Sequence, residues 1–260
     1  MDRCDGRMVL ESYRHLLDVY FDPIASRFKD THPNVFSVWS MVFAIAAGIS
    51  YALSGVFVPG SKSHAYPFLL MVGLLFVILN SIADTLDGRI ARMHGKSSKL
   101  GDFLDHTMDR LSDVAILAGI AISSYCNTIF GLVSVISVLL ASYMGTQSQA
   151  VGAGRNYRGI MGRADRMVLL MILTPLQFII SVVWGVKGWD PFGLLGHEIT
   201  PLELLLAVML MGGALTFAQR WMETFRELSE KDDPYDDRVS RRRGGTNGKR
   251  GRIKRSPPLH

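Results

Sequence analysis

The sequence contains only two cysteines, Cys4 and Cys126, among its 260 residues. The charge pattern described below places them on opposite sides of a membrane, so they cannot pair with each other. The first 30 residues carry charges throughout, and they contain no segment that resembles a cleavable signal peptide. No internal repeat is evident. A disulfide framework is therefore excluded, and no processing of the N-terminus is expected.

Charge is also missing from five long stretches of the chain. These stretches are Val35–Leu53, Ala65–Ala83, Val114–Gly154, Met167–Val186 and Leu204–Gln219. A membrane-spanning helix needs about 20 predominantly apolar residues, so the long third stretch holds two helices, and their turn is expected at Ser123–Thr128. The sequence therefore predicts an all-α integral membrane protein with six transmembrane helices, counting the polar starts of the third and sixth.

Lysine and arginine are distributed unevenly between the loops. One set of segments is basic and holds Arg3, Arg7, Arg14, Arg27 and Lys29, then Arg89, Arg92, Lys96 and Lys99, then Arg155, Arg158, Arg163 and Arg166. The intervening loops offer only Lys62 and Lys187. Because cytoplasmic loops carry the excess of positive charge, both termini are expected in the cytoplasm. We expect a multi-pass protein of the cell membrane.

The two ends of the chain differ in composition from the apolar part. Residues 8–28 place an aromatic and aliphatic stripe on one helical face, which predicts an N-terminal amphipathic helix in the membrane interface, bent or divided at Pro23. Residues 238–260 hold nine basic residues and no acid, and this tail is expected to be disordered and drawn to anionic headgroups. Nucleic-acid binding is not expected beside six spans.

These features divide the chain into three parts. Residues 1–31 form the N-terminal cytoplasmic or interfacial helix, residues 32–228 the six-helix transmembrane catalytic domain, and residues 229–260 the charged cytoplasmic tail.

Four acids interrupt the apolar pattern at the cytoplasmic ends of the second and third spans. Asp84 and Asp87 are three residues apart, and Asp105 and Asp109 are four apart, so each pair lies on one helical face. Acids in this setting are expensive and mark functional sites. Two divalent ions would offset their charge, and oxygen ligands suit Mg²⁺, Mn²⁺ or Ca²⁺. The alternative is that the acids only form ion pairs with nearby basic residues.

Two further acids share a face with the second pair. Asp102 precedes Asp105 by three residues, and Asp113 follows Asp109 by four. Asp102 is interpreted as an acid that stabilises a helix N-terminus, and Asp113 as a residue that orients a neighbour. Neither is assigned to the metal site.

The spacing of these residues resembles a family signature. Asp84-x-x-Asp87-Gly88-x-x-Ala91-Arg92, eight residues, and Gly101-x-x-x-Asp105-x-x-x-Asp109 is similar to the motif of the CDP-alcohol phosphotransferases, also called CDP-alcohol phosphatidyltransferases. Members of that family are integral membrane enzymes of phospholipid biosynthesis, which join a CDP-activated lipid to an alcohol and release CMP. Eight fixed residues across 26 positions make this a specific match.

The resemblance implies roles for individual residues. Asp84, Asp87, Asp105 and Asp109 would bind two divalent ions, Mg²⁺ or Mn²⁺, and Asp109 would also act as the catalytic general base. The CDP-lipid would be bound by residues at the start of the first span and along the motif, namely Pro33, Asn34, Gly88, Ala91, Arg92 and Ser98.

A second part of the resemblance concerns the acceptor. Ser142-Tyr143, a loop, the pair Arg163-x-x-Arg166 and then Arg220 are similar to the subgroup of phosphatidylinositol-phosphate and archaetidylinositol-phosphate synthases. Arg163, Arg166 and Arg220 would then bind the phosphate of inositol 1-phosphate. Gly145 and Gln147 depart from this subgroup, which has basic residues there; either Arg155 or Arg158 replaces that charge, or the acceptor differs.

Alternatives therefore stay open at this point. Glycerol 3-phosphate is the second acceptor considered, and the lipid is either a diacylglycerol or an archaeol type. A cation transporter would also contain intramembrane acids, but its site is expected near the bilayer midplane. A membrane anchor with a basic tail leaves the acidic pattern unexplained. The family resemblance further implies a homodimer.

Overall fold

The structure is a computed structural model, and it describes residues 14–28, 31–55, 66–96, 98–154, 159–183 and 199–231. The described residues form seven helices. They are α1 (Arg14–Arg27), α2 (Pro33–Ser54), α3 (Phe68–Met93), α4 (Lys99–Ile122), α5 (Thr128–Ala150), α6 (Arg163–Val183) and α7 (Pro201–Lys231).

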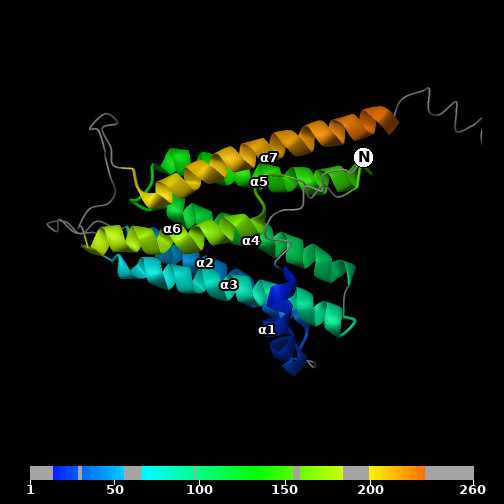
Figure 1. The fold of residues 1–260 in the computed structure, drawn as a ribbon, viewed down its shortest axis with the longest axis horizontal. Helices are drawn as coiled ribbons and strands as arrows, with labels where there is room; N and C mark the ends of the chain where they lie inside the picture. Colours follow the sequence, from blue (N-terminus) through cyan, green and yellow to red (C-terminus); the bar gives the residue numbers. More distant parts are fainter. Residues whose placement is uncertain are drawn as a thin grey trace, which may run out of the picture.

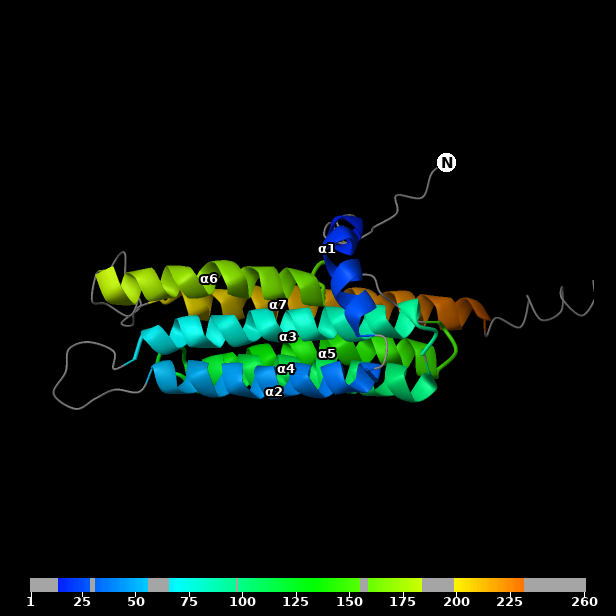
Figure 2. The same cartoon turned by 90° about the horizontal axis from the view of Figure 1, so that it is seen from below.

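Helices α2 to α7 run side by side along the long axis of the molecule, and α1 crosses them (Figures 1 and 2). Each of the five uncharged stretches of the sequence overlaps a described helix, and the long third stretch contains the end of α4 and all of α5. These two helices are separated by residues 123–127, where the turn was predicted. The all-α prediction holds for the described part of the chain.

Five helices are long and apolar enough to cross a membrane: α2, α3, α5, α6 and α7. Helix α4 does not meet that criterion, because its first half carries the charges of the predicted site. It nevertheless packs against α2 and α5 as part of the bundle.

The surface of α2 shows what surrounds the bundle. Its buried positions include Ser37, Ser40 and Gly48, whereas Val38 and Trp39 are more than half exposed. A helix that turns small polar residues inward and large apolar residues outward suits a lipid environment, where small residues let helices approach closely. This arrangement agrees with an integral membrane protein.

Two glycines bring α2 and α4 into close backbone contact. A Cβ atom on Gly48 would lie 2.2 Å from the carbonyl oxygen of Ala115, and one on Gly119 would lie 2.1 Å from the carbonyl oxygen of Gly48. No other residue fits at either position without moving a helix. This crossing fixes α4 beside α2, and thereby fixes the direction in which the acids of α4 point.

Helix caps set the ends of the bundle near the acids. Pro33 is the first residue of α2, where its missing N–H costs nothing, and His32 is the N-cap. Helix α4 begins at Lys99, two residues before Gly101 of the motif. The reason is that the Ser98 hydroxyl oxygen accepts a hydrogen bond from the Gly101 backbone N–H, which is a typical N-cap.

Helix α1 packs across the C-terminal part of α3. Ala25 is fully buried against Leu86 and Ile90, and the Arg89 guanidinium donates a hydrogen bond to Asp22. The predicted amphipathic helix over residues 8–28 is therefore helical at least over α1, while residues 8–13 lie outside the described part. Its placement in a membrane interface stays a prediction, as does the disorder of the tail, since residues 232–260 also lie outside it.

Candidate active site

Three of the four predicted metal ligands gather at one point between α3 and α4. Asp84, Asp105 and Asp109 each offer a carboxylate oxygen, and these atoms all lie within 4.8 Å of one another. All three side chains are partly buried. The spacing of four residues puts Asp105 and Asp109 on one face of α4, as the sequence predicted, and that face lies toward Asp84 of α3.

Asp87 points toward a different neighbour. Its carboxylate oxygen Oδ2 accepts a hydrogen bond of 2.7 Å from the Ser37 hydroxyl of α2, and both residues are about 95% buried. Asp87 lies one turn after Asp84 on α3 but is rotated toward α2. Its role as a metal ligand stays a prediction, and Ser37 is a contact that the motif does not contain.

Arg163, the first residue of α6, lies directly at the acid cluster. Its Nη1 nitrogen donates hydrogen bonds to Oδ2 of Asp84 at 2.6 Å and to Oδ1 of Asp109 at 2.5 Å. This is possible because α6 begins well inside the bundle, alongside the middle of α3 and α4 (Figures 1 and 2). The sequence placed Arg163 in an acceptor-phosphate pocket, and the structure adds that it contacts two of the acids.

Arg166, one turn later on α6, is paired with Asp113. Its Nη2 nitrogen donates to Oδ2 of Asp113 at 2.5 Å, and both residues are about 95% buried. The second carboxylate oxygen of Asp113 lies 3.6 Å from Nε of Arg163. Asp113 therefore orients both arginines of the Arg-x-x-Arg pair. The position of Asp113 one turn after Asp109 indicated an orienting role, but nothing in the sequence identified its partners.

The third predicted acceptor arginine makes a separate contact. The Arg220 Nη1 nitrogen of α7 donates to the carbonyl oxygen of Ala141 in α5 at 2.6 Å. Asp113 thus brings Arg163 and Arg166 together, while Arg220 contacts the neighbouring helix α5.

The residues predicted to bind the CDP-lipid lie along α3 and at the starts of α2 and α4. The Arg92 guanidinium lies over Gly88, since a Cβ atom there would be 3.4 Å from Arg92 Nη1. A Cβ atom on Gly101 would be 3.8 Å from Oδ1 of Asn34, so the start of α4 lies beside the start of α2. Arg92 and Ser98 are exposed and Pro33 is buried. Ala91, the remaining member of this set, is half-buried on α3.

A buried polar network lies one turn below the acids. Asn80 is fully buried, and its amide nitrogen donates to the carbonyl and hydroxyl oxygens of Ser40 at 2.9 and 2.8 Å, and to the Ser112 hydroxyl at 3.4 Å. These residues join α3 to α2 and α4. Asn80 is four residues before Asp84 and Ser112 three after Asp109, so the network supports both acid-bearing helices. An asparagine inside an uncharged run was the available sequence signal.

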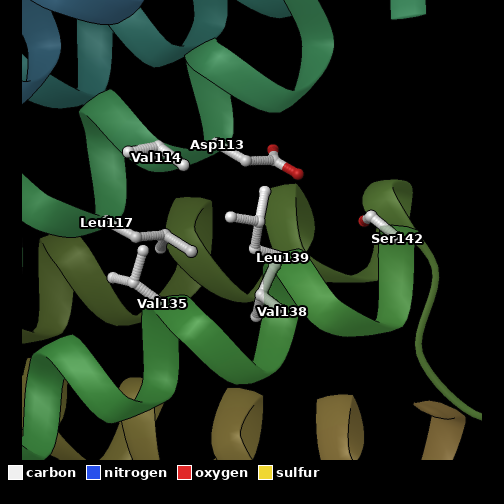
Figure 3. Close-up of a pocket in the computed structure, with 7 residues that line it drawn as sticks. All are labelled: Asp113, Val114, Leu117, Val135, Val138, Leu139 and Ser142. Atoms are coloured by element: carbon white, nitrogen blue, oxygen red, sulfur yellow. The ribbon is translucent and has the colours of Figure 1, made fainter. Parts of the chain in front are cut away.

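A small pocket lies between α4 and α5, and Figure 3 shows its lining. Five apolar side chains form most of it, namely Val114, Leu117, Val135, Val138 and Leu139, while Asp113 and Ser142 supply polar atoms. The buried Ser142 belongs to the Ser-Tyr pair of the sequence, and Tyr143 is more than half exposed. The pocket therefore borders the Asp113–Arg166 pair from the side of α5.

The chemistry of the donor set fits a hard divalent cation. The cluster offers carboxylate oxygens from three residues within a few ångström, and oxygen-rich sites of this kind suit Mg²⁺ or Mn²⁺. The charge balance agrees. Five aspartates, Asp84, Asp87, Asp105, Asp109 and Asp113, lie near three arginines, Arg110, Arg163 and Arg166, so negative charge remains to be neutralised.

The fold and this site define a helical, multi-pass membrane protein with a cluster of acids between two neighbouring helices, α3 and α4. The model of the CDP-alcohol phosphatidyltransferase family matches residues 30–218. The chain therefore belongs to this family of transferases, as its motif indicated.

Two similar proteins within the family are inositol phosphate synthases by name. The chain is 28% identical over 166 residues to a phosphatidylinositol phosphate synthase of Streptomyces avermitilis, covering 62% of this chain and 64% of that protein. It is 36% identical over 133 residues to an archaetidylinositol phosphate synthase of Pyrococcus horikoshii, covering 49% of this chain and 71% of that one. The chain thus spans slightly less than two thirds of the Streptomyces protein.

A solved structure shares the fold. The phosphatidylinositol phosphate synthase of Mycobacterium tuberculosis with CDP-DAG bound superposes with a TM-score of 0.59, covering 78% of this chain and 92% of that one, at 20% sequence identity. The same protein has been solved in complex with manganese and citrate, with the same TM-score and 20% identity, over 78% of this chain and 88% of that one. At this identity the likeness shows the arrangement of helices.

Proposed function

We propose that this chain is a metal-dependent phospholipid synthase, which transfers a phosphatidyl-type group from a CDP-lipid to the hydroxyl of a phosphorylated alcohol and releases CMP. The observation that carries the proposal is the cluster of Asp84, Asp105 and Asp109 at the family's motif positions. Family membership argues against a cation transporter, which is the alternative that also uses intramembrane acids.

In this reaction the acceptor hydroxyl attacks the lipid-side phosphorus, a new P–O bond forms, and the bond to CMP breaks. Asp109 accepts the hydroxyl proton as general base, since it is the last acid of the motif, and its carboxylate accepts a hydrogen bond from Arg163. Asp84, Asp87 and Asp105 complete the set that would hold two divalent ions. Such ions, when bound, neutralise the diphosphate and orient the leaving group.

Binding of the CDP part is assigned to Pro33, Asn34, Gly88, Ala91, Arg92 and Ser98. The position of Gly88 supports this assignment, because the nearest atoms to a Cβ there would belong to the flexible Arg92 guanidinium, at 3.4 Å and beyond, so a diphosphate can approach the backbone once that side chain moves. Arginine also suits phosphate oxygens, to which it donates two hydrogen bonds at once.

Inositol 1-phosphate is the proposed acceptor, with glycerol 3-phosphate as the alternative. This acceptor is supported by the Streptomyces and Pyrococcus relatives, which are inositol phosphate synthases by name, together with the arginines at the site. Arg163, Arg166 and Arg220 are proposed to receive the acceptor phosphate. The two relatives use different lipids, so the lipid part of the substrate is a diacylglycerol or an archaeol type.

The proposed placement in the membrane has six spans. They are the five apolar helices and α4, which is the third span in chain order. Its apolar second half and its contacts with α2 and α5 support this count. Both termini and the acid cluster would face the cytoplasm, by the positive-inside argument. The three-part division at residues 31 and 228, the cell-membrane location and a homodimer belong to the same proposal.

The decisive experiment measures CMP release by the purified protein with CDP-lipid, Mg²⁺ or Mn²⁺, and a panel of acceptors. The panel holds inositol 1-phosphate, glycerol 3-phosphate, free inositol and serine, each with both lipid types. Asp84→Asn is the matched control for metal dependence. CMP release that needs metal and inositol phosphate supports the proposal; no release with any acceptor, or release only with serine, contradicts it.

Arg220→Ala tests the acceptor pocket. If Arg220 holds the acceptor phosphate, the apparent KM for that substrate rises roughly 10- to 150-fold, and the KM for CDP-lipid changes little. If Arg220 only ties α7 to α5 through Ala141, the variant loses thermal stability and keeps the acceptor KM.

A further inference from the structure

The guanidinium of Arg163 lies where two predicted metal ligands meet. One nitrogen, Nη1, donates both to Asp84 at 2.6 Å and to Asp109 at 2.5 Å, and both acids belong to the cluster whose oxygens lie within 4.8 Å. A Mg²⁺ ion bound by two carboxylate oxygens lies about 2.1 Å from each. A cation bound to these same oxygens would therefore occupy the volume of that nitrogen.

Charge leads to the same conclusion. The two hydrogen bonds place a fixed positive charge against two carboxylates in a partly buried site, where charges are screened less than in water. A divalent ion near the same carboxylates would be repelled by the guanidinium if it stayed. Metal binding and the Arg163 contacts thus exclude each other, both by volume and by charge.

A second partner for Arg163 is already next to it. The Nε nitrogen of Arg163 and the Oδ1 oxygen of Asp113 are both buried without a hydrogen-bond partner, and they lie 3.6 Å apart. A small rotation of the Arg163 side chain would close this gap into a hydrogen bond. Asp113 cannot move away, because its other oxygen is held by the buried Arg166 at 2.5 Å.

We propose that Arg163 competes with the divalent cation for Asp84 and Asp109, and that Asp113 receives the arginine when the cation binds. The inference rests on the proposed function, and it adds a coupling between two of its parts. Arg163 is also assigned to the acceptor phosphate. Its release from the acids would make it available to that phosphate only after the metal is in place, so the acceptor site is completed by metal loading.

The test is a direct titration of the purified full chain with Mn²⁺, without substrates, followed by the electron paramagnetic resonance signal of the free ion. Arg163→Met keeps the length of the side chain and removes its charge and donors. If Arg163 is a competitor, this variant binds Mn²⁺ at least about tenfold more tightly than the wild type. Arg226→Met is the matched control, because Arg226 is exposed and paired only with Glu230 in the described contacts; its affinity should stay within about threefold.

The role of Asp113 is tested by a double-mutant cycle. Asp113→Asn alone should weaken Mn²⁺ binding severalfold, because the displaced Arg163 loses its charged partner. In the Arg163→Met background the same substitution should have no effect, since no arginine remains to be received. A loss of similar size in both backgrounds would show that Asp113 acts only by holding Arg166, and would overturn its part of the proposal. Thermal melting of each variant in detergent checks that the fold is kept.

The remaining outcomes separate this inference from the proposed function. Unchanged or weaker Mn²⁺ binding by Arg163→Met, with metal-dependent CMP release intact in the wild type, overturns the competition and leaves the enzyme assignment standing. Binding of Mn²⁺ by neither the wild type nor Arg163→Met overturns both.

Discussion

At the scale of single residues, the acids are not equivalent. Asp109 lies against Arg163 in the cluster with Asp84 and Asp105, whereas Asp87 is turned toward Ser37 on α2. The motif spacing alone treats all four as ligands. The structure separates them, because α2 and α6 approach α3 from different sides. Asp87 contacts Ser37 of α2, whereas Asp84 contacts Arg163 of α6.

Asp109→Asn should abolish turnover and leave part of the metal-dependent binding of CDP-lipid. The amide cannot take the proton of the attacking hydroxyl, and loss of a general base typically lowers the rate by about 10²–10⁴-fold. CMP release gives the rate, and a filter assay with labelled CDP-lipid gives the binding. Asp102→Asn is the control, because Asp102 is exposed in the first turn of α4. CMP release near the wild-type rate in Asp109→Asn would contradict the assignment of the base.

Ser37→Ala should weaken metal binding through Asp87. The serine hydroxyl donates a 2.7 Å hydrogen bond to a carboxylate that is 4% exposed, and a hydrogen bond to a charged group contributes roughly 1.5–3 kcal/mol. Losing it lets the Asp87 side chain leave its position, so the Mn²⁺ affinity should fall about tenfold. Ser50→Ala on the same helix is the control, because the Ser50 hydroxyl bonds only its own helix at Ala46. Equal affinities in both variants would mean that Asp87 binds no metal.

At the scale of helices, the sequence predicted most of the fold and part of the site. Uncharged runs located all five apolar helices, since a charged side chain in the lipid is costly however the helices pack. The spacing of Asp105 and Asp109 predicted their shared face on α4, because that spacing is internal to one helix, whereas Asp87 turns away from Asp84 toward α2. The contact of Arg163 with the cluster was not predictable, because it depends on how far α6 reaches along α3 and α4. That depth is set by packing between helices, and no local pattern records it.

The pairs Ser37–Asp87 and Arg166–Asp113 were missed for a related reason. Each joins residues about 50 positions apart, so the partner is defined only once the helices are packed. A buried serine or arginine carries no mark in the sequence that distinguishes it from an exposed one. The Asp-x-x-Asp and Asp-x-x-x-Asp motifs were recognisable because their spacing is internal to one helix.

Gly48→Ala tests the helix crossing that positions α4. Replacing a helical glycine with alanine normally favours the helix by about 0.8–1.0 kcal/mol. At Gly48 the added Cβ would lie 2.2 Å from a backbone oxygen, which cannot give way like a side chain, and overpacking costs typically 1–3 kcal/mol or more. We expect the cost of this clash to exceed the gain in helix propensity. We expect the melting temperature in detergent to fall by several degrees, with Mn²⁺ affinity falling as α4 shifts.

Gly73→Ala is the matched control for this crossing. Its nearest atoms are ring carbons of Tyr51 at 3.2–3.3 Å, which can move by a few tenths of an ångström. Its melting temperature should change little or rise. If Gly48→Ala behaves like Gly73→Ala, α2 and α4 are not in backbone contact.

At the scale of the whole molecule, the site depends on four helices that are distant in the chain. Helix α2 contributes Ser37, α3 and α4 contribute the acids, and α6 contributes both paired arginines. Helices α5 and α7 pack against each other, and α5 also borders Asp113 through the pocket of Figure 3. Helix α7 extends beyond the other helices at the end where α3 ends and α4 begins (Figures 1 and 2). The basic segment 238–260 follows this extension in the sequence after six residues, of which four are aspartates.

Deleting residues 238–260 should leave the fold and metal-dependent catalysis intact. Every described helix ends at or before Lys231, and every residue assigned to the site lies upstream of it. The segment removed holds nine basic residues and no acid, and each basic residue near an anionic surface contributes about 1 kcal/mol of attraction. The truncated protein in nanodiscs of neutral lipid should therefore release CMP at the wild-type rate.

The tail itself should respond to lipid charge and to salt. In full-length protein labelled through Ser256→Cys, with both native cysteines replaced, energy transfer to a headgroup dye should be higher in anionic than in neutral nanodiscs. Raising the salt from 0.1 M to 1 M shortens the screening length from about 10 Å to about 3 Å, so this difference should shrink. Equal energy transfer in anionic and neutral nanodiscs would show that anionic headgroups do not hold the tail. A truncated protein that melts like the wild type but releases no CMP would instead make the tail part of the active site.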